Sequence, residues 1–327
     1  MRTVVTGAAG FIGSTLVDHL LADGHQVIGI DNLSRGSRDN LANAVHFDKR
    51  HRGRFAFIPA DVEEAEVSGI VAGTNPDVVF HLAAQVDLRA SVSDPIRDAR
   101  ANILGTINVL EACRRAGVRR VVYAASGGSR YGEPDRLPVD ETATPGPQSP
   151  YAAAKVAGEL YLNAYAEMYG IQTISLALAN VYGPRQSPQG EAGVVAVFGS
   201  AMIAGRSVTV YGDGTSTRDY VYVDDVASAF VKAAYAPPDA RGTYNIGTGE
   251  QTTVPQIHGL IAALLDGSAL PSVAPARTGE LHAIALDATR AGSQLGWHPE
   301  VALEEGIRRT IAWMSSTTER SGVLVEA

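Results

Sequence analysis

Short hydrophobic runs alternate with helical patterns along the first half of the chain. The runs are rich in Val, Ile, Leu and Phe, and several are apolar almost throughout, which is typical of parallel strands buried on both faces of a sheet. Repeated strand–helix units predict a doubly wound, Rossmann-like α/β fold. The predicted strands are Thr3–Thr6, Gln26–Asp31, Arg54–Pro59, Val78–Ala83, Arg120–Ala125 and Gln172–Ala179.

Between these strands the apolar residues follow helical spacing. Ile12, Leu16 and Leu20 recur every four residues, and Gly24 ends the pattern, as glycine often does at the end of a helix. A further helix is predicted over Ala101–Ala116. The first half therefore has the element order that a dinucleotide-binding domain needs.

After Asn180 the pattern changes to loops rich in Gly, Pro and polar residues, interrupted by helical stretches over Asp224–Ala236 and Ala302–Met314. We therefore predict a dinucleotide-binding domain over residues 1–179 and a smaller mixed α/β substrate domain over residues 180–327. The second domain is expected to return an element to the main sheet around residues 218–247.

The composition narrows the possible partners. The chain has 327 residues, of which 45% are hydrophobic and 19% charged, and its net charge of −8 argues against nucleic-acid binding. The single cysteine, Cys113, excludes an intramolecular disulfide. The sequence has neither a signal-peptide pattern nor an apolar run near the roughly 20 residues that span a bilayer. We therefore expect a cytoplasmic enzyme with no membrane or nucleic-acid partner and no metal.

The segment Gly7–Gly13 lies between the first strand and the first helix. Its glycines allow the backbone to approach a pyrophosphate, and a helix N-terminus attracts negative charge. Asp31 ends the second strand and could accept hydrogen bonds from ribose hydroxyls, which favours NAD over NADP. Arg35 and Arg38 could instead receive a 2′-phosphate, but the Asp31 carboxylate would repel it. Asp61, after the third strand, is placed either to contact adenine or to cap a helix.

Tyr151 and Lys155 lie four residues apart on a predicted helix that begins at Ser149-Pro150, so they share a face. A nearby ammonium group lowers the pKa of a tyrosine from its usual value of about 10, toward the range useful for acid–base catalysis. The alternative is an ordinary pair on a surface helix.

Taken together, these motifs resemble the NAD-dependent epimerase/dehydratase family of extended short-chain dehydrogenases/reductases, most closely its UDP-glucose 4-epimerases. The resemblance covers nearly the whole chain. Its markers are Gly7–Gly13, Asp31-Asn32, His81–Ala84, Asn102, Ser126 with Tyr131-Gly132, Tyr151 with Lys155, Asn180–Arg185, and Gly212–Gly214 with Arg218–Tyr220.

The resemblance implies bound NAD, a UDP-sugar substrate and a homodimer. The implied catalytic residues are Tyr151, Lys155 and Ser126. The implied cofactor-binding residues are Gly7, Gly10, Phe11, Ile12, Gly13, Asp31, Asn32, Leu33, Ser34, Gly36, Asp61, Val62, Leu82, Ala83, Ala84, Asn102, Tyr151 and Lys155. The implied substrate-binding residues are Ser126, Tyr151, Asn180, Val194, Val195, Val210, Tyr211, Arg218 and Arg277.

The mechanism implied by the resemblance is reversible oxidation of the sugar at C4. Tyr151, assisted by Lys155, takes the proton from O4, while NAD⁺ takes the C4 hydride and later returns it to the opposite face. Ser126 hydrogen-bonds O4. From size alone, Gly127 and Gly128 are expected to leave room for the sugar to turn.

Two positions depart from the family pattern. Gly127 stands where many members carry Ser or Thr, so we assign that hydroxyl role to Ser126, with Ser129 as second choice. Arg130 stands where an apolar residue is usual. Related dehydratases carry Asp-Glu where this chain has Gly127-Gly128, which favours epimerisation over a dehydratase or decarboxylase.

The exact substrate is left open by the sequence. UDP-glucose and UDP-galactose are the default, with N-acetylated and uronic UDP-sugars as alternatives, and the position that admits an N-acetyl group is assigned to Ile284. A dinucleotide-sensing regulator is disfavoured, because such proteins usually lose the Tyr/Lys pair. The helices over 101–116 and 150–169 are expected to form the dimer contact. An apolar stripe with Leu160 and Met168 fits either that contact or packing within one subunit.

Overall fold

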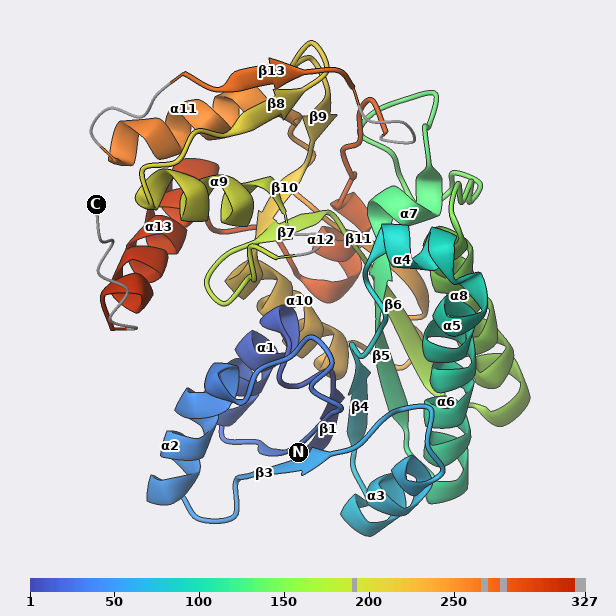
Figure 1. The fold of residues 1–327 in the computed structure, drawn as a ribbon. Coiled ribbons are helices and arrows are strands. Elements are labelled where there is room, and N and C mark those ends of the chain that lie inside the picture. Colours follow the sequence, from blue (N-terminus) through green and yellow to red (C-terminus); the bar gives the residue numbers. More distant parts are fainter. Residues whose placement is uncertain (190–192, 266–269, 277–280, 321–327) are drawn as a thin grey trace.

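A seven-stranded parallel sheet forms the centre of the molecule in the computed structural model (Figure 1), which describes residues 1–189, 193–265, 270–276 and 281–320. The strand order is β11-β6-β5-β4-β1-β2-β3, and every neighbouring pair is parallel. The strands are β1 (Arg2–Thr6), β2 (Gln26–Asp31), β3 (Phe55–Pro59), β4 (Val78–His81), β5 (Arg120–Ser126), β6 (Gln172–Leu178) and β11 (Gly242–Ile246).

The predicted doubly wound α/β fold is confirmed, and the six strands predicted in the first half have nearly the boundaries expected. One helix differs from its prediction. The stretch expected as a single helix over Ala101–Ala116 begins with a π-helical turn, η2 (Arg100–Leu104), and continues as α6 (Gly105–Ala116). Side-chain periodicity does not distinguish such a turn from an α-helix.

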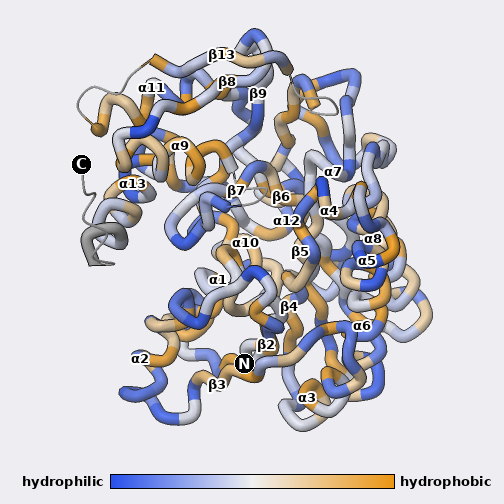
Figure 2. Tube along the Cα trace, viewed as in Figure 1, coloured by the Kyte–Doolittle hydropathy of each residue, from blue (hydrophilic) through white to orange (hydrophobic). Residues whose placement is uncertain are grey.

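Helices cover both faces of the sheet, and each face has its own apolar core. One core includes Leu16, Leu20 and Phe230, and the other includes Val109 and Leu162. The first face carries α1 (Phe11–Ala22), η1 (Arg38–Leu41), α2 (Ala42–Arg50), α10 (Val223–Tyr235) and α12 (Thr289–Leu295); the second carries α3 (Glu66–Thr74), α6 and α8 (Pro150–Tyr169). Hydrophobic colours accordingly concentrate along the inner strands in Figure 2.

The second half of the chain adds a smaller body around Phe198, Ile257 and Ile311, which Figure 1 shows above the sheet. Its strand pairs are β7 (Asn180–Tyr182) with β10 (Tyr220–Tyr222), β8 (Thr209–Tyr211) with β13 (Ser272–Ala274), and β9 (Thr217–Arg218) with β12 (Thr252–Thr253). Its helices are α9 (Val194–Ile203), α11 (Val254–Leu264) and α13 (Leu303–Arg320). The chain also returns to the main sheet, because β11 pairs with β6 at its edge.

The sheet topology places the loops that could hold a ligand. The chain runs from β1 outward to β3, then crosses back to β4 on the other side of β1. Ligands of open α/β sheets bind at the carboxyl ends of the strands, where the order reverses in this way. Three short helices near that edge are α4 (Leu88–Ser93), α5 (Pro95–Ala99) and α7 (Gly127–Tyr131). No helix among the described residues combines the length and apolarity needed to cross a membrane.

Candidate active site

The glycine-rich turn between β1 and α1 is closed so tightly that side chains would not fit. Gly7 has a φ of +70°, and a Cβ there would lie 2.8 Å from the backbone nitrogen of Ala83. A Cβ on Gly13 would lie 2.0 Å from the carbonyl oxygen of Gly7. The turn therefore depends on both glycines, and it lies against the loop that follows β4.

Asp31, at the carboxyl end of β2, links the glycine-rich turn to the loop that follows β2. One carboxylate oxygen accepts a hydrogen bond from the backbone N–H of Ala9 at 2.9 Å, and the other accepts one from Leu33 at 2.8 Å. Burial raises the pKa of the Asp31 carboxyl, and the backbone hydrogen bonds oppose that shift. Its predicted contact with a ribose remains a prediction.

Helix α8 begins as its sequence indicates, and it presents the Tyr/Lys pair to the sheet edge. The Ser149 hydroxyl accepts a hydrogen bond from the N–H of Ala152 at 3.1 Å, and Pro150 occupies the first turn. Lys155 is almost fully buried, donates a hydrogen bond to the carbonyl of Ala124 at 3.0 Å, and lies 4.9 Å from the centroid of the Tyr123 ring.

The electrostatic prediction for this pair was wrong in one respect. Burial lowers the pKa of Lys155 to about 8, and burial together with the charge of Asp98 raises the pKa of Tyr151 to about 12. The lowered tyrosine pKa expected from Lys155 is not seen in the chain alone, because burial of the phenol and the negative charge of Asp98 both favour its neutral form.

The two candidate serines lie in direct contact. Ser126 ends β5 and directly precedes α7, and its hydroxyl donates to the hydroxyl of Ser129 at 3.0 Å. The expected free space beside them is absent at Gly127, where a Cβ would lie 2.5 Å from Cδ1 of Leu286. Gly127 therefore serves packing against Leu286, and the prediction of room for a turning sugar was wrong at this position.

A cavity of about 1510 Å³ joins the glycine-rich turn, Asp31 and the Tyr/Lys pair, whereas Ser126 and Ser129 are not among its lining residues. Its other wall comes from the second half of the chain and includes Arg185, Gln186 and Trp313. The predicted cofactor-binding residues that line it are Gly7, Gly10, Phe11, Ile12, Gly13, Asp31, Asn32, Ser34, Gly36, Asp61, Val62, Leu82, Ala83, Ala84, Tyr151 and Lys155. Leu33 packs instead against the apolar core, and Asn102 is buried and hydrogen-bonds Gln85 in both directions.

A buried carboxylate that the sequence analysis missed lies beside the Tyr/Lys pair. Asp98, on α5, lines the cavity, and its Oδ1 accepts hydrogen bonds of 2.9 Å from both Gln85 and Asn102. Its Oδ2 is buried without a hydrogen-bond partner in the described part of the chain. No sequence signal marks Asp98, because its neighbours come together only through the packing of α5 on α8.

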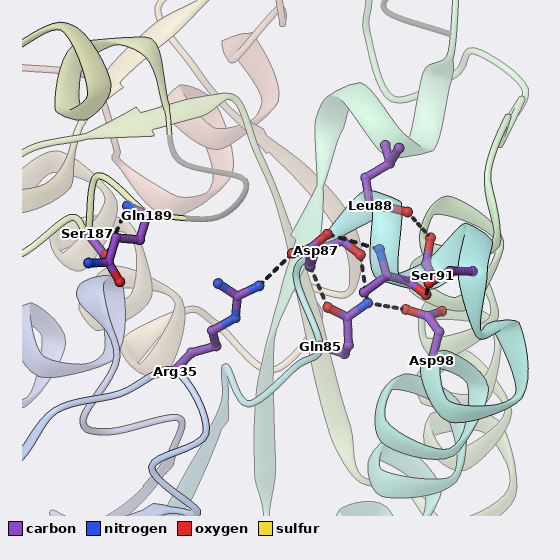
Figure 3. Close-up of polar contacts among 10 residues, drawn as sticks. Arg35, Gln85, Asp87, Leu88, Ser91, Asp98, Ser187 and Gln189 are labelled. Carbon is purple, nitrogen blue, oxygen red and sulfur yellow. Dashed lines mark hydrogen bonds and ion pairs between the residues drawn. The ribbon is translucent and has the colours of Figure 1, made fainter. Parts of the chain in front are cut away.

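Figure 3 shows how this network continues from Asp98 through Gln85 to Asp87. Arg35 pairs with Asp87 at 2.6 Å, joining the loop after β2 to the loop after β4. Arg38 lies 4.9 Å from the centroid of the Phe57 ring. Both arginines that could have received a 2′-phosphate therefore have partners within the chain, and Asn32 likewise donates to Asp61 at 2.7 Å.

Apart from Ser126 and Tyr151, the predicted substrate-binding residues lie in the second half of the chain, and those that the structure describes do not line the cavity. They are Asn180 on β7, Val194 and Val195 at the start of α9, Val210 and Tyr211 on β8, and Arg218 on β9. Arg218 donates to the carbonyl of Thr217 at 2.8 Å. Arg277 lies outside the described residues. Ile284 is buried in a cluster with Tyr131, Val139 and Leu286, away from the described lining of the cavity.

Comparisons with known proteins agree with this geometry. Residues 3–247 match the model of the NAD dependent epimerase/dehydratase family. A UDP-glucose 4-epimerase of Mycolicibacterium smegmatis is 50% identical over 98% of this chain and 100% of its own length. A Thermotoga maritima UDP-glucose 4-epimerase solved with UDP-glucose superposes with a TM-score of 0.91 at 42% identity, covering 97% of this chain and 99% of its own.

A Thermus thermophilus UDP-glucose 4-epimerase solved in complex with NAD gives a TM-score of 0.87 at 42% identity, over 96% of this chain and 99% of its own. Both the family match and these full-length similarities include the glycine-rich turn and the Tyr/Lys helix. The chain belongs to the NAD dependent epimerase/dehydratase family.

Proposed function

We propose that this protein is an NAD-dependent UDP-glucose 4-epimerase that interconverts UDP-glucose and UDP-galactose. The observation that carries the proposal is one cavity lined by the glycine-rich turn, Asp31, Tyr151 and Lys155. A dinucleotide site and an acid–base pair therefore meet where a sugar could lie between them. The full-length similarity to proteins with this activity supports the same reaction.

The residues present fit NAD. Gly7, Gly10 and Gly13 line the cavity, so the backbone of the turn can face a pyrophosphate there. Asp31 lies at the end of β2, where a carboxylate can reach a ribose. When bound there, NAD⁺ would supply the acceptor for the hydride of the sugar C4. Lys155, beside Tyr151, would bond the nicotinamide ribose.

In the proposed mechanism, the side chains of the protein transfer the proton of the sugar O4 and hold the O4 oxygen in place. Tyr151, as phenolate, accepts the proton of the sugar O4 and later gives it back. Its pKa of about 12 in the chain alone means that a positive charge must enter the cavity to ionise it. When NAD is bound, its oxidised nicotinamide ring would add this charge to the one that Lys155 already carries. Ser126 holds O4 through a hydrogen bond.

A dehydratase requires further acid–base groups to eliminate water across C5 and C6. Related dehydratases carry these groups where this chain has Gly127 and Gly128. Gly127 packs on Leu286, and a Cβ on Gly128 would lie 3.7 Å from Cδ1 of Leu281. These positions supply no acid, so epimerisation is the reaction that the described groups support.

The proposal is tested with purified protein assayed on UDP-galactose, UDP-N-acetylgalactosamine and UDP-glucuronate. We expect turnover of UDP-galactose at the highest kcat/KM. Absence of epimerisation with all three substrates would refute the proposed function. Preference for an N-acetylated or uronic sugar would keep the reaction and change the substrate.

The site assignment is tested with Tyr151→Phe. We expect bound NAD to be retained and kcat to fall by about 10²- to 10⁴-fold, the usual contribution of an acid–base group. Tyr161→Phe is the matched control, because Tyr161 lies on the same helix with its side chain exposed. Full activity of Tyr151→Phe would show that another group acts as the base.

We also propose a homodimer and a cytoplasmic location. Leu160 and Met168 of α8 are 64% and 69% exposed, and Leu104 of η2 is 56% exposed. These apolar side chains lie on the helix layer of α5, α6 and α8, which Figure 1 shows together at one side of the sheet. Exposed apolar groups gathered on one layer are typical of a subunit contact, and packing within this subunit does not account for them.

A further inference from the structure

A buried ion pair lies next to the candidate active site without lining the cavity. The guanidinium of Arg130, on α7, donates from Nη1 to Oε2 of Glu159, on α8. The side chains are only 13% and 4% exposed. The same carboxylate oxygen accepts a hydrogen bond from the hydroxyl of Thr243, on β11, at 2.6 Å. One oxygen atom thus joins the short helix, the Tyr/Lys helix and the edge strand of the sheet.

Stability alone gives a poor account of this pair. Burying two charges costs free energy that their attraction often only offsets, and apolar replacements of similar volume are often as stable. The pair is also incompletely satisfied, since Nε of Arg130 and Oε1 of Glu159 are buried without hydrogen-bond partners in the described part of the chain. What the pair does provide is a fixed geometry between the elements that carry it.

Those elements carry the reacting groups. Arg130 directly follows Ser129, whose hydroxyl accepts from Ser126. Glu159 lies one turn after Lys155 on α8. Helix α7 has only five residues, and so short a helix has little stability of its own. Its position must come from tertiary contacts, and the Arg130–Glu159 pair is a buried charged contact among those that tie it to α8.

A hydrogen bond from Tyr131 is a second contact that holds α7 in place. Tyr131, the last residue of α7, donates from its hydroxyl to Oδ1 of Asn245 on β11 at 2.7 Å. The Arg130 guanidinium lies 5.4 Å from the centroid of the Tyr131 ring. The end of α7 is therefore held from β11 through Tyr131 and from α8 through Arg130.

We propose that Arg130 and Glu159 are positioning residues for catalysis, whose buried ion pair holds the serine-bearing helix α7 in register with Tyr151 on α8. The inference rests on the proposed function. Neither Arg130 nor Glu159 is among the residues that line the cavity. Ser129 moves with α7 and Ser126 directly precedes that helix, so a shift of α7 changes the distance of the Ser126 hydroxyl from the oxygen on which Tyr151 acts.

The experiment removes the polar groups together. In the apolar triple variant Arg130→Met/Glu159→Leu/Thr243→Val, no charge or hydroxyl is left unpaired, and we expect a melting temperature close to that of the parent. If the pair positions α7, kcat with UDP-galactose still falls by about 10²-fold, the scale of a misplacement of about 1 Å. KM and the amount of bound NAD should stay near the parent values, because uniform binding is not lost.

Two conservative variants keep the test decisive if the triple variant does not fold. Arg130→Lys retains the charge without the planar fork, and Glu159→Gln retains the shape and an acceptor for Thr243. Each should lose part of kcat at nearly unchanged KM, and Arg130→Lys should exceed Arg130→Met in kcat. Arg241→Met is the matched control: Arg241 and Glu167 form an exposed pair at 3.4 Å between the start of β11 and α8, and its loss should leave kcat unchanged.

The proposal is overturned if the triple variant, or both conservative variants, turn over UDP-galactose at the parent rate. It is also overturned if the loss appears in KM or in bound NAD, because the pair would then act on binding. Tyr151→Phe separates this outcome from failure of the proposed function. An inactive Tyr151→Phe with fully active Arg130 and Glu159 variants refutes only the positioning role, whereas an active Tyr151→Phe refutes the proposed site.

Discussion

At the scale of single residues, the hydroxyl pair of Ser126 and Ser129 sets the detail of the proposed chemistry. Ser126 lies at the carboxyl end of β5, on the sheet edge where ligands of this fold bind, and Ser129 lies one turn along α7. The 3.0 Å hydrogen bond from Ser126 to Ser129 orients the first hydroxyl through the second. We therefore propose unequal roles for the two serines, with Ser126 contacting the sugar and Ser129 supporting it.

We expect Ser126→Ala to lower kcat by about 10²-fold, because the hydrogen bond to O4 is lost. Ser129→Ala should lower kcat by less than about tenfold, because it removes only the partner of that hydroxyl. Steady-state kinetics with UDP-galactose measure both effects. A larger loss in Ser129→Ala would assign the contact with O4 to Ser129.

His81 gives a prediction for acid stability. Its ring is buried between the hydroxyls of Thr6 and Thr106, at 2.8 and 3.1 Å, and burial lowers its pKa from 6.5 to about 3. Below pH 6.5 the His81 ring therefore binds a proton in the unfolded chain, whereas in the folded chain it binds one only near pH 3. Stability supported by the neutral ring is complete above pH 6.5 and falls as the pH falls toward 3.

Between pH 7 and pH 5, His81 should account for a loss of about 2 kcal/mol in the free energy of unfolding. His81→Asn cannot take up this proton, so its stability should fall less over the same interval. Urea denaturation of both proteins at the two pH values measures the difference. Equal losses in the two proteins would contradict the assigned pKa.

At the scale of elements, the glycine-rich turn is the part of the molecule that least tolerates a substitution. A methyl group on Gly13 would lie 2.0 Å from the carbonyl of Gly7, so Gly13→Ala must open the turn. We expect loss of bound NAD and a decrease of about 1–3 kcal/mol in the free energy of unfolding, as for other overpacked sites. Absorbance of released cofactor and denaturation curves measure these effects.

Gly69→Ala is the control for this substitution. Gly69 lies in α3, and a Cβ there meets nothing within 4 Å. Alanine is the better helix former by about 0.5–1 kcal/mol, so this variant should retain NAD and be slightly more stable. If Gly13→Ala behaved like Gly69→Ala, the turn would be more adaptable than its contacts indicate.

The elements that could be predicted are those whose signals are local. Six strands followed from apolar runs, and the start of α8 followed from Ser149 and Pro150, because strand burial and helix capping depend on neighbouring residues. The glycine-rich turn between β1 and α1 and the placement of Tyr151 and Lys155 on one helix also followed from local signals. The surroundings of Tyr151 could not be predicted, because Asp98 approaches it only through packing. The pairing of Arg130 with Glu159 could likewise not be predicted, because the two residues lie 29 positions apart in the sequence.

At the scale of the whole molecule, the exposed apolar side chains on α8 and η2 predict the oligomeric state. We expect sedimentation velocity to show a dimer, and the double substitution Leu104→Glu/Leu160→Glu to give monomers, because four carboxylates would be buried in a two-fold contact. Val45→Glu, at an exposed apolar position of α2 on the other face of the sheet, should leave the dimer intact. A monomeric parent protein would refute the predicted contact.

The return of β11 to the edge of the main sheet determines when that sheet can be completed during synthesis. Strand β6 ends at Leu178, but its outer partner, Gly242–Ile246, leaves the ribosome more than sixty residues later. Until then β6 presents an unpaired hydrophobic edge, which is a template for wrong strand pairing. The nascent chain is therefore most exposed to aggregation while its second half is being translated, and a ribosomal pause in that stretch would prolong the exposure.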